Sequence, residues 1–409
     1  MSDRIYVGLD IGTTKVCVIV AAVNQDGLVN ILGVGRADNE GMNRGTVTHI
    51  DKTVRSIKTA VQEAETQAGT TIRAVNIGIA GDHIQSFQSR GVVAISNSDN
   101  EITRRDVERL LTDTKKVALP SDRRIIHVIP QEFIVDGQDG IYDPVGMSGI
   151  RMEANVHIIT GSVTATQTLY KCVERAGLEV NDLVLEPLAS SYSVLNEEEK
   201  EVGIVLVDIG GGTTDVAIFE DKTIRHTSVL AIAGKKVTED IRKGLGILNE
   251  DAEKLKREHG CAFLPEIVND TPITLRGIGG RKPMEISKSL LCQIIQPRME
   301  EIFEIVGLEI KRSGYSRHLH SGIVLTGGGS LITGTTSLAR EVLGMPVKLG
   351  LPDGFSGGLN TEVENPIYST GIGLIMHGMK YQASVLSKEY NSKFGGNIFK
   401  KMIDWFNDL

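Results

Sequence analysis

Several features that would decide the class of a protein are missing from this sequence. No run of apolar residues reaches about 18, the number that a membrane-spanning helix needs, and the first residues lack the apolar core of a signal peptide. The 44 Lys and Arg do not outnumber the 52 Asp and Glu, and the net charge is -8. We therefore expect no export, no transmembrane segment and no nucleic-acid partner, since nucleic-acid binders neutralise phosphates with clustered cations.

Cysteine is scarce as well. The four cysteines show none of the paired spacings that a zinc site or a redox couple requires. We interpret them as small buried hydrophobic residues in the reduced cytoplasm of a bacterial-type cell, at Cys17, Cys172, Cys261 and Cys292.

What the sequence does contain is an internal repeat. The segment Asp10-Ile-Gly-Thr-Thr-Lys-Val returns in the second half of the chain as Asp208-Ile-Gly-Gly-Gly-Thr-Thr-Asp-Val. Apolar runs precede and follow each copy, which predicts a strand, a Gly/Thr turn and a second strand. The chain, with 409 residues of which 41% are apolar, exceeds a single hydrophobic core. The repeat therefore predicts two related halves.

Turns rich in glycine and threonine suit phosphate groups, because backbone N–H groups converge there and hydroxyls add donors. We expect the two turns to face each other with phosphate between them, and Lys15 to supply positive charge. Asp10 and Asp208, at the ends of the first strands, would hold the waters of a hydrated Mg²⁺. A third glycine-rich strand end, after Thr326, would pack against a purine and its ribose. The remaining predicted nucleotide residues are Gly12, Thr13, Thr14, Gly210, Gly211, Gly212, Thr213, Thr214, Asp215, Gly327, Gly328, Gly329 and Ser330.

For each motif alone, a plain β-turn is the alternative interpretation. Duplication, together with the third glycine-rich strand end, favours phosphate binding. The chain contains no Gly-x-x-x-x-Gly-Lys-Ser/Thr motif and no complete Gly-x-Gly-x-x-Gly that opens a helix, so Walker-type and Rossmann-type binding are not expected.

Five motifs stand in the order typical of the actin, Hsp70 and sugar-kinase ATPase family: Asp10-Ile-Gly-Thr-Thr-Lys15, Glu186-Pro-Leu-Ala-Ser190, Asp208-Ile-Gly-Gly-Gly-Thr-Thr-Asp215, Thr326-Gly-Gly-Gly-Ser330 and Gly371-Ile-Gly373. Between the first two, the segments His127-Val-Ile-Pro-Gln-Glu-Phe-Ile-Val-Asp-Gly137 and Asp143-Pro-Val-Gly-Met-Ser-Gly-Ile-Arg-Met-Glu153 resemble the bacterial cell-division family FtsA. The resemblance implies an α/β, actin-like (ribonuclease H-like) two-lobed fold. It also implies a duplicated core, an FtsA-type inserted subdomain and a C-terminal amphipathic helix.

The same resemblance implies boundaries within the chain. We expect 1–83 and 163–197 to form the first actin-like core subdomain, 84–162 the insertion, 198–232 and 306–381 the second core subdomain, 233–305 a small subdomain of the second lobe, 382–396 a flexible linker and 397–409 a membrane-targeting helix. The linker also follows from composition, because apolar density falls there while Ser, Lys, Glu, Asn and Gly accumulate.

FtsA-like proteins bind ATP, polymerise and sit on the inner face of the cytoplasmic membrane. They hold the tubulin-like FtsZ ring there and help to recruit later division proteins. The resemblance therefore implies ATP and Mg²⁺ as cofactors, at most slow ATP hydrolysis, and a location on the cytoplasmic face of the cell membrane at the division site. Its implied partners are the C-terminal peptide of FtsZ, other copies of the chain and later division proteins.

Carried onto this chain, the resemblance gives individual residues their roles. Glu186 would orient a hydrolytic water, the alternative being a helix-start carboxylate before Pro187. Arg298 would meet the acidic and apolar tail peptide of FtsZ, the alternative being a solitary, solvated helix residue.

The resemblance also points to a segment that closes over the adenosine. Gly234, Glu253 and Lys256 match it, although Ala233 stands where the family often has another glycine. That departure bears on how closely the backbone approaches the nucleotide.

The last residues, from Asn397, predict an amphipathic helix. At about 100° per residue, the apolar side chains fall on one side and the polar ones on the other. The helix, about 18 Å long, is too short to span a bilayer, and a core-packing helix would show the same pattern. Its terminal place and its Trp and Phe beside Lys favour a membrane surface, where one copy binds weakly and a filament tightly. The predicted membrane residues are Ile398, Phe399, Met402, Ile403, Trp405, Phe406 and Leu409.

Three other functions share the repeated hairpins. A sugar-kinase-type phosphotransferase needs an aspartate base in a sugar pocket, and we find no candidate for it. An Hsp70-like chaperone needs a substrate domain of roughly 200 residues after the ATPase, which the chain does not have room for. A pilus-assembly relative of actin is disfavoured by the inserted segment 127–137.

Overall fold

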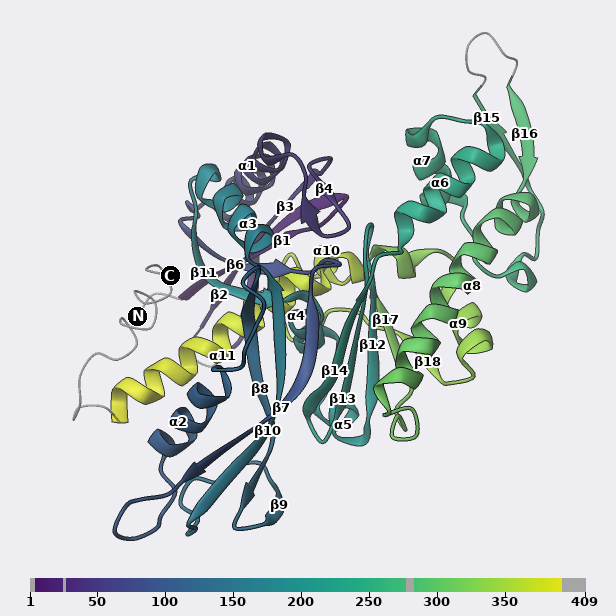
Figure 1. Ribbon diagram of the computed structural model, residues 1–409. Coiled ribbons are helices and arrows are strands. Elements are labelled where there is room, and N and C mark those ends of the chain that lie inside the picture. The colour runs from purple at the N-terminus through teal and green to yellow at the C-terminus, as the bar shows by residue number, and fades with distance from the viewer. Residues whose placement is uncertain (1–3, 25–26, 277–282, 392–409) are drawn as a thin grey trace.

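The computed structural model describes residues 4–24, 27–276 and 283–391 of the chain. Figure 1 shows two lobes side by side, a sheet that extends below them and a small helical region at the upper right. Each lobe is built on a mixed sheet whose first hairpin contains one copy of the repeated motif. The two-lobed arrangement expected from the repeat is therefore present.

The first lobe contains a six-stranded sheet. Alternate residues of its second strand point to opposite faces, and both faces are covered, so the run Val16–Ala22 is buried throughout. One face packs on α1 (Ile50–Ala68) and α3 (Val163–Ala176), and the other on α11 (Ser369–Asn391). In spatial order the strands are β11 (Glu179–Leu185), β6 (Ala74–Ile79), β1 (Arg4–Ile11), β2 (Lys15–Val23), β3 (Val29–Asp38) and β19 (Gly357–Gly358).

The second lobe contains a five-stranded sheet that shares one hydrophobic core with the small helical region. Side chains of β12 and β13 pack in the same cluster as those of α6 to α9. The strands, in spatial order, are β14 (Thr223–Leu230), β13 (Thr214–Glu220), β12 (Ile204–Ile209), β17 (Ile323–Thr326) and β18 (Val347–Leu349). The helical region and its neighbours comprise α6 (Gly234–Leu245), α7 (Asn249–His259), η1 (Leu264–Glu266), the hairpin β15 (Pro272–Leu275) and β16 (Met284–Ser287), α8 (Lys288–Ser313) and α9 (Thr335–Leu343).

The inserted segment folds into a separate four-stranded antiparallel sheet, with α2 (Arg104–Thr114) packed on it. Its order is β7 (Gln85–Ala94), β10 (Arg151–Ser162), β8 (Arg123–Val135) and β9 (Gln138–Ile141). Polar side chains of this sheet reach the edge strand β14 of the second lobe: Gln131 Nε2 donates to Ile224 O at 2.8 Å, and the ring nitrogen Nε2 of His157 lies 3.0 Å from Thr227 Oγ1. The insertion therefore contacts both lobes.

Short elements complete the chain. They are β4 (Met42–Asn43), β5 (Thr46–Val47), α4 (Glu186–Val194), α5 (Glu197–Val202), η2 (Gly328–Leu331), α10 (Asn360–Val363) and η3 (Pro366–Tyr368).

In the second lobe, α6 ends before Gly246, which adopts a left-handed φ of 63°, and α7 starts after it. One sequence expectation needs correction. The flexible linker expected at 382–396 is wrong for residues 382–391, which continue α11. That stretch contains neither Gly nor Pro, so its polar composition does not interrupt the helix.

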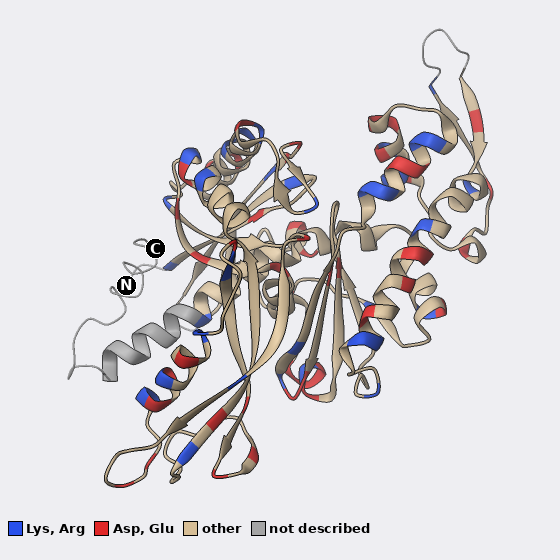
Figure 2. Ribbon diagram, in the orientation of Figure 1, with Lys and Arg blue, Asp and Glu red and all other residues tan. Residues whose placement is uncertain are grey.

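Residues 392–396 and the amphipathic helix expected at 397–409 lie outside the described residues. In the part of the chain that the structure covers, no helix is both long and apolar enough to cross a membrane. All four cysteines are buried and free, as expected. Figure 2 shows that charged residues gather on the helices and loops, while the sheets are largely uncharged.

Candidate functional site

Two β-hairpins, one from each lobe, meet between the lobes. β1 and β2 pair antiparallel, and their turn closes with a hydrogen bond from Gly12 N to Lys15 O at 2.9 Å. β12 and β13 form the second hairpin, whose turn closes with a bond from Gly210 N to Thr213 O, also at 2.9 Å. The repeated motif thus builds the same backbone turn twice.

The tips of the two turns are in direct contact. A Cβ atom added to Gly211 would lie 2.5 Å from the side chain of Thr14, and one added to Gly212 would come still closer to Thr13. Real side chains do not approach so closely, so these two positions require glycine. The threonine tip of the first turn therefore packs against the glycine backbone of the second, and the structure brings the two predicted loops together.

The two turns have the same backbone hydrogen bond, but the matching threonines of the two motifs occupy different positions in them. Lys15 closes the first turn and Thr213 the second, so the two Thr-Thr pairs do not occupy equivalent places. Thr213 Oγ1 donates to Asp215 Oδ2 at 3.1 Å, and the fully buried Thr214 donates its hydroxyl to Ile232 O at 2.7 Å. We expected both threonines to face phosphate. Their hydroxyls are instead used within the second lobe, because the two additional glycines form the turn and leave the threonines at the start of β13.

Asp10, at the end of the first strand, is paired with a cation. Lys15 Nζ lies 3.1 Å from Asp10 Oδ2 and donates to Ile367 O at 2.6 Å. Burial by itself would lower the pKa of Lys15, but the carboxylate of Asp10 and other negative groups nearby outweigh it, so the pKa is raised. Lys15 is therefore a fixed positive charge at the first turn.

Asp208, the matching residue of the second strand, is held by a hydroxyl. Ser190 Oγ donates to Asp208 Oδ2 at 2.8 Å. Burial raises the pKa of Asp208 to about 6; the hydrogen bond from Ser190 opposes this rise, and the charge of Asp10 adds to it. The two equivalent carboxylates thus have different partners.

Two more acidic side chains lie in the same field. Asp215 is 3% exposed, and among the described residues its Oδ1 has no hydrogen-bond partner. Burial, followed by the charge of Asp208, raises the pKa of Asp215 well above its usual range. The pKa of Glu186, the first residue of α4, is also raised well above its usual range, mainly by burial and then by the charges of Asp10, Asp215 and Asp208. Such a concentration of carboxyl groups favours a bound cation.

No direct metal cage is formed, however. Within the described ranges, no group of three or more His, Cys, Asp or Glu side chains is placed to hold a metal ion.

The third glycine-rich strand end lies against the second hairpin. Gly327 has a φ of 80°, and a Cβ atom added to it would collide with Asp208 Oδ1. Ser330, which is buried, donates its hydroxyl to Gly327 O at 2.6 Å and so closes this loop. Gly328 faces the side chain of Ile367 at 3.5 Å from an added Cβ. This loop, with Gly329 at its centre, therefore lies beside both Asp208 and Ile367, the residue whose carbonyl accepts from Lys15.

The residues expected to close over an adenosine also come together. Gly234 N donates to Gly210 O at 3.1 Å, which joins the start of α6 to the second turn. Lys256 Nζ donates to Gly234 O at 3.1 Å and to Glu253 Oε2 at 2.7 Å. Ala233 has an extended φ of -167°, which any residue can adopt, so the missing glycine causes no backbone strain there.

Sequence reasoning missed several residues of this site. Asn39 donates through Nδ2 to Gly12 O at 2.8 Å, and Ile367 provides the carbonyl for Lys15. Asn39 lies outside the quoted motifs, and Ile367 lies just before the Gly371-Ile-Gly373 motif, but neither carries a local signal of its own. Ser190 was inside a quoted motif, and its spacing of one helical turn from Glu186 could have placed it on the same face of α4.

Arg298 lies away from the hairpins, in α8, and is neither solitary nor fully exposed. Its Nε donates to Asp240 Oδ2 at 2.6 Å, and its Nη1 pairs with Glu301. The side chain is 25% exposed. The hydrogen bond to Asp240 raises the pKa of Arg298. The alternative of a solitary, solvated helix residue is therefore wrong.

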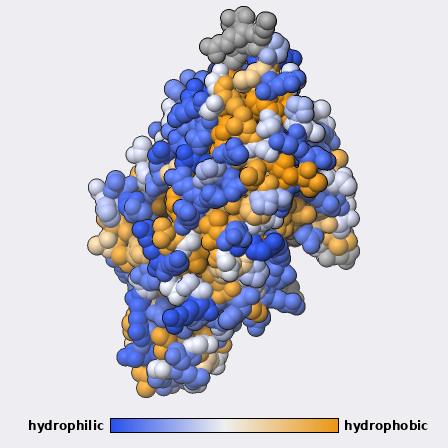
Figure 3. Space-filling view, turned by 90° about the vertical axis from the view of Figure 1, so that its right-hand side faces the viewer, coloured by the Kyte–Doolittle hydropathy of each residue, from blue (hydrophilic) through white to orange (hydrophobic). Residues whose placement is uncertain are grey.

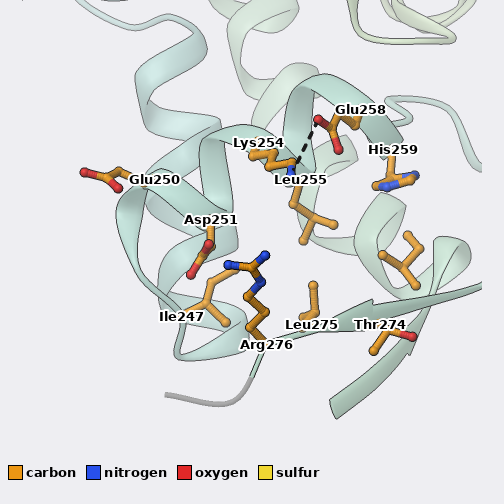
Figure 4. A pocket seen from close by; sticks show the side chains of 11 residues that line it. Ile247, Glu250, Asp251, Lys254, Leu255, Glu258, His259, Thr274, Leu275 and Arg276 are labelled. Carbon is orange, nitrogen blue, oxygen red and sulfur yellow. Dashed lines mark ion pairs between the residues drawn. The ribbon is translucent and has the colours of Figure 1, made fainter. Parts of the chain in front are cut away.

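The same helical region contains a hollow of about 350 Å³ between α7, the turn before it and β15, separate from the hairpins (Figure 4). Its walls carry charges of both signs, including Lys254 and Glu258, which pair at 4.0 Å. The other lining residues are Ile247, Glu250, Asp251, Leu255, His259, Ile273, Thr274, Leu275 and Arg276.

Comparisons with known proteins extend these observations. A family model described as "Cell division protein FtsA" matches residues 205–373, and a model described as "SHS2 domain inserted in FTSA" matches residues 81–160. The second range overlaps the insertion expected at 84–162.

Full-length relatives agree with the family models. The cell division protein FtsA of Pseudomonas aeruginosa is 46% identical over 386 residues, covering 94% of this chain and 92% of that protein. FtsA of Escherichia coli K12 is 40% identical over 382 residues, covering 92% and 90%.

Solved structures with low sequence identity establish the fold. A chain of the PilM-PilN type IV pilus biogenesis complex has a TM-score of 0.67 and 17% identity, covering 91% of this chain and 98% of its own. MreB 5 of Spiroplasma citri, bound to AMPPNP, has a TM-score of 0.58 and 14% identity, covering 94% and 99%. The actin-like α/β fold is thereby confirmed. Given identities of 40 to 46% over nearly the whole length, the chain belongs to the FtsA family of actin-like cell-division proteins.

Proposed function

We propose that the chain binds ATP with Mg²⁺ between its two lobes. The observation that carries this proposal is the contact of the two tips, in which Thr13 and Thr14 meet Gly211 and Gly212. One polyphosphate can reach both turns only if they are adjacent. Exposed N–H groups of glycine turns are the donors that phosphate oxygens need.

The residues present fit this ligand. Lys15 would neutralise phosphate charge, and Asp10 and Asp208 would hold waters of the metal ion. The unpaired Oδ1 of Asp215 supports a polar or cationic occupant beside it, since a buried acceptor without a partner is costly. When bound, the metal ion supplies charge neutralisation at the phosphates.

The purine and ribose would lie between the third glycine loop and the start of α6. Gly327, Gly328, Gly329 and Ser330 form one side of this place. The second side consists of Gly234, Glu253 and Lys256, already joined by hydrogen bonds.

We assign Glu186 a water-positioning role in at most slow hydrolysis. Burial and the charges of Asp10, Asp215 and Asp208 raise the pKa of Glu186, and its carboxyl can hold a water through a hydrogen bond. Its side chain lies over Gly78 of β6, where an added Cβ would be 2.9 Å from Glu186 Cγ. A side chain at position 78 would therefore displace the Glu186 carboxyl, whose Oε1 would lie 3.3 Å from that Cβ.

In the cell, we propose that the protein polymerises and tethers the FtsZ ring to the cytoplasmic face of the membrane at the division site. It would also help to recruit later division proteins. Membership of the FtsA family and the actin-like fold support this role. Attachment would use the predicted terminal helix, of residues 397–409.

The C-terminal peptide of FtsZ, which is acidic and apolar, would bind at the small helical region around Arg298. Exposed apolar side chains of that region are Leu264, Val268, Met284 and Leu290. Figure 3, which views the molecule from this side, shows apolar surface gathered in its upper part. An acidic peptide would compete with Asp240 and Glu301 for Arg298.

Co-sedimentation with liposomes tests the membrane part of this proposal. The intact protein is compared with a protein that ends at Gly396, each with and without ATP and FtsZ. We expect ATP to increase sedimentation of the intact protein, because many terminal helices on one filament bind more tightly than one. FtsZ should sediment only with the intact protein. Full sedimentation of the truncated protein would exclude the terminal anchor.

A further inference from the structure

A buried serine fixes the position of the Asp208 carboxylate. Ser190 Oγ donates to Asp208 Oδ2 at 2.8 Å and lies 3.1 Å from Thr370 Oγ1, in the first turn of α11. Ser190 is fully buried, and Asp208 and Thr370 are 9% and 7% exposed. A serine hydroxyl has one proton, and here it points to the carboxylate. The Thr370 hydroxyl also hydrogen-bonds the Asp208 carboxyl, so two neighbouring hydroxyls, of Ser190 and Thr370, support the same carboxylate.

The other carboxylate oxygen is confined by packing. Asp208 Oδ1 lies against Gly327, where an added Cβ would collide with it. With one oxygen bonded to Ser190 and the other against a glycine, the carboxylate has little freedom to rotate. Three segments distant in the sequence therefore set the orientation of one side chain on β12: α4, the glycine that precedes η2, and α11.

Asp10 is held differently. Its partner Lys15 also donates to Ile367 O. A polyphosphate would compete with Asp10 for the Lys15 ammonium, whereas the bond between Ser190 and Asp208 is internal to the helix junction. The two carboxylates are thus held in different ways, and only Asp208 is fixed in advance.

We propose that Ser190, supported by Thr370, is a positioning residue that orients Asp208 toward the hydrated Mg²⁺ of the bound nucleotide. The inference rests on the proposed ATP site. Partners that orient groups around a metal contribute about 10- to 100-fold to metal affinity. Ser190 acts through Asp208 and touches neither nucleotide nor metal itself.

The test measures the ATP dissociation constant of Ser190→Ala at saturating Mg²⁺ and again in EDTA. We expect about tenfold weaker binding with Mg²⁺ and an unchanged constant in EDTA. Ser193→Ala is the matched control. Ser193 lies one turn further along α4, is also buried, and its hydroxyl is 2.7 Å from Ser369 O in α11, but it contacts no carboxylate. An equal loss in both conditions, or the same Mg²⁺-specific loss in Ser193→Ala, overturns the proposal.

Thr370 provides a second pair of variants if Ser190→Ala does not fold. Thr370→Ser keeps the hydroxyl and should keep Mg²⁺-dependent affinity, while Thr370→Val keeps the shape and should lose part of it. Equal affinities of these two variants contradict the support by the Thr370 hydroxyl. If the unaltered protein binds no ATP at all, the proposed site itself fails. If it binds Mg²⁺-ATP and Ser190→Ala binds equally well, only the role of Ser190 fails.

Discussion

The two hairpins at the centre of the molecule have the same backbone turn, but they differ in the residues at the tip and in the partners of their carboxylates. Both turns close with one N–H to O bond between residues three apart, at 2.9 Å. The first tip has threonine where the second has glycine, and the tips fit together because of this difference. The first carboxylate, Asp10, is held by an ammonium group, and the second, Asp208, by hydroxyls. Equivalent halves can share one ligand only if their contact surfaces become complementary instead of staying identical.

The largest expected effect comes from filling the glycine tip. Gly211→Val places branched carbons against Thr14, so the lobes must separate or the turn must move. We expect at least about 100-fold weaker ATP binding and destabilisation of about 1–3 kcal/mol, measured by calorimetric titration and urea unfolding. The double variant Gly211→Val with Thr14→Gly should recover part of both losses. A single variant that binds ATP normally would show that the tips need not touch.

A smaller effect, of opposite sign in the two hairpins, comes from neutralising each carboxylate. Because the folded protein holds the Asp208 proton with a pKa of about 6 against 3.8 for the ordinary group, its free energy of unfolding falls as the pH rises through this window. Asp208→Asn should therefore stabilise the nucleotide-free protein by about 3 kcal/mol at pH 8, and by little at pH 4. Asp10→Asn should destabilise it, since Lys15 loses its partner.

Urea unfolding at pH 4, 6 and 8 measures both variants. Each should weaken Mg²⁺-ATP binding, because each removes a carboxylate that would hold waters of the metal ion. Destabilisation by Asp208→Asn at pH 8 would contradict the described burial of this group.

The smallest effect concerns the threonines of the second hairpin. Thr214→Val removes a hydroxyl that donates to Ile232 O inside the second lobe. We expect a loss of about 1 kcal/mol in stability and an ATP affinity that changes less than about twofold. Thr13→Val, at the tip of the first turn, is the comparison. Its hydroxyl accepts from Gly45 N at 3.0 Å, and its loss should weaken ATP binding more than that of Thr214. If Thr214→Val weakened ATP binding more than Thr13→Val, the hydroxyl of Thr214 would face the phosphates after all.

Much of the fold follows from the sequence because the signals are local. The repeated motif between apolar runs predicts both hairpins, and the glycine-rich strand end expected after Thr326 is found where β17 ends. Gly177, the residue after α3, has a left-handed φ of 95°, a conformation that favours glycine at the end of a helix. The linker prediction for residues 382–391 is wrong, because a polar composition does not end a helix that contains no Gly or Pro at these positions.

The site is less predictable than the fold. Identical letters suggested that Thr213 and Thr214 match Thr13 and Thr14, but hydrogen-bond register decides which residues reach a turn. The partners of the charged groups, such as Ile367 for Lys15, come from segments hundreds of residues away and have no motif of their own. Arg298 pairs with Asp240, which is 58 positions away in the chain, so the sequence alone does not show that Arg298 has a partner.

Hydrogen exchange of the unaltered protein, with and without Mg²⁺-ATP, tests most directly whether both hairpins share one nucleotide. Peptides that contain residues 10–15 and 208–213 report on the two turns separately. We predict that ATP slows exchange in both turns, with the same dependence on ATP concentration. Protection of one turn while the other exchanges as in the free protein would contradict the shared site.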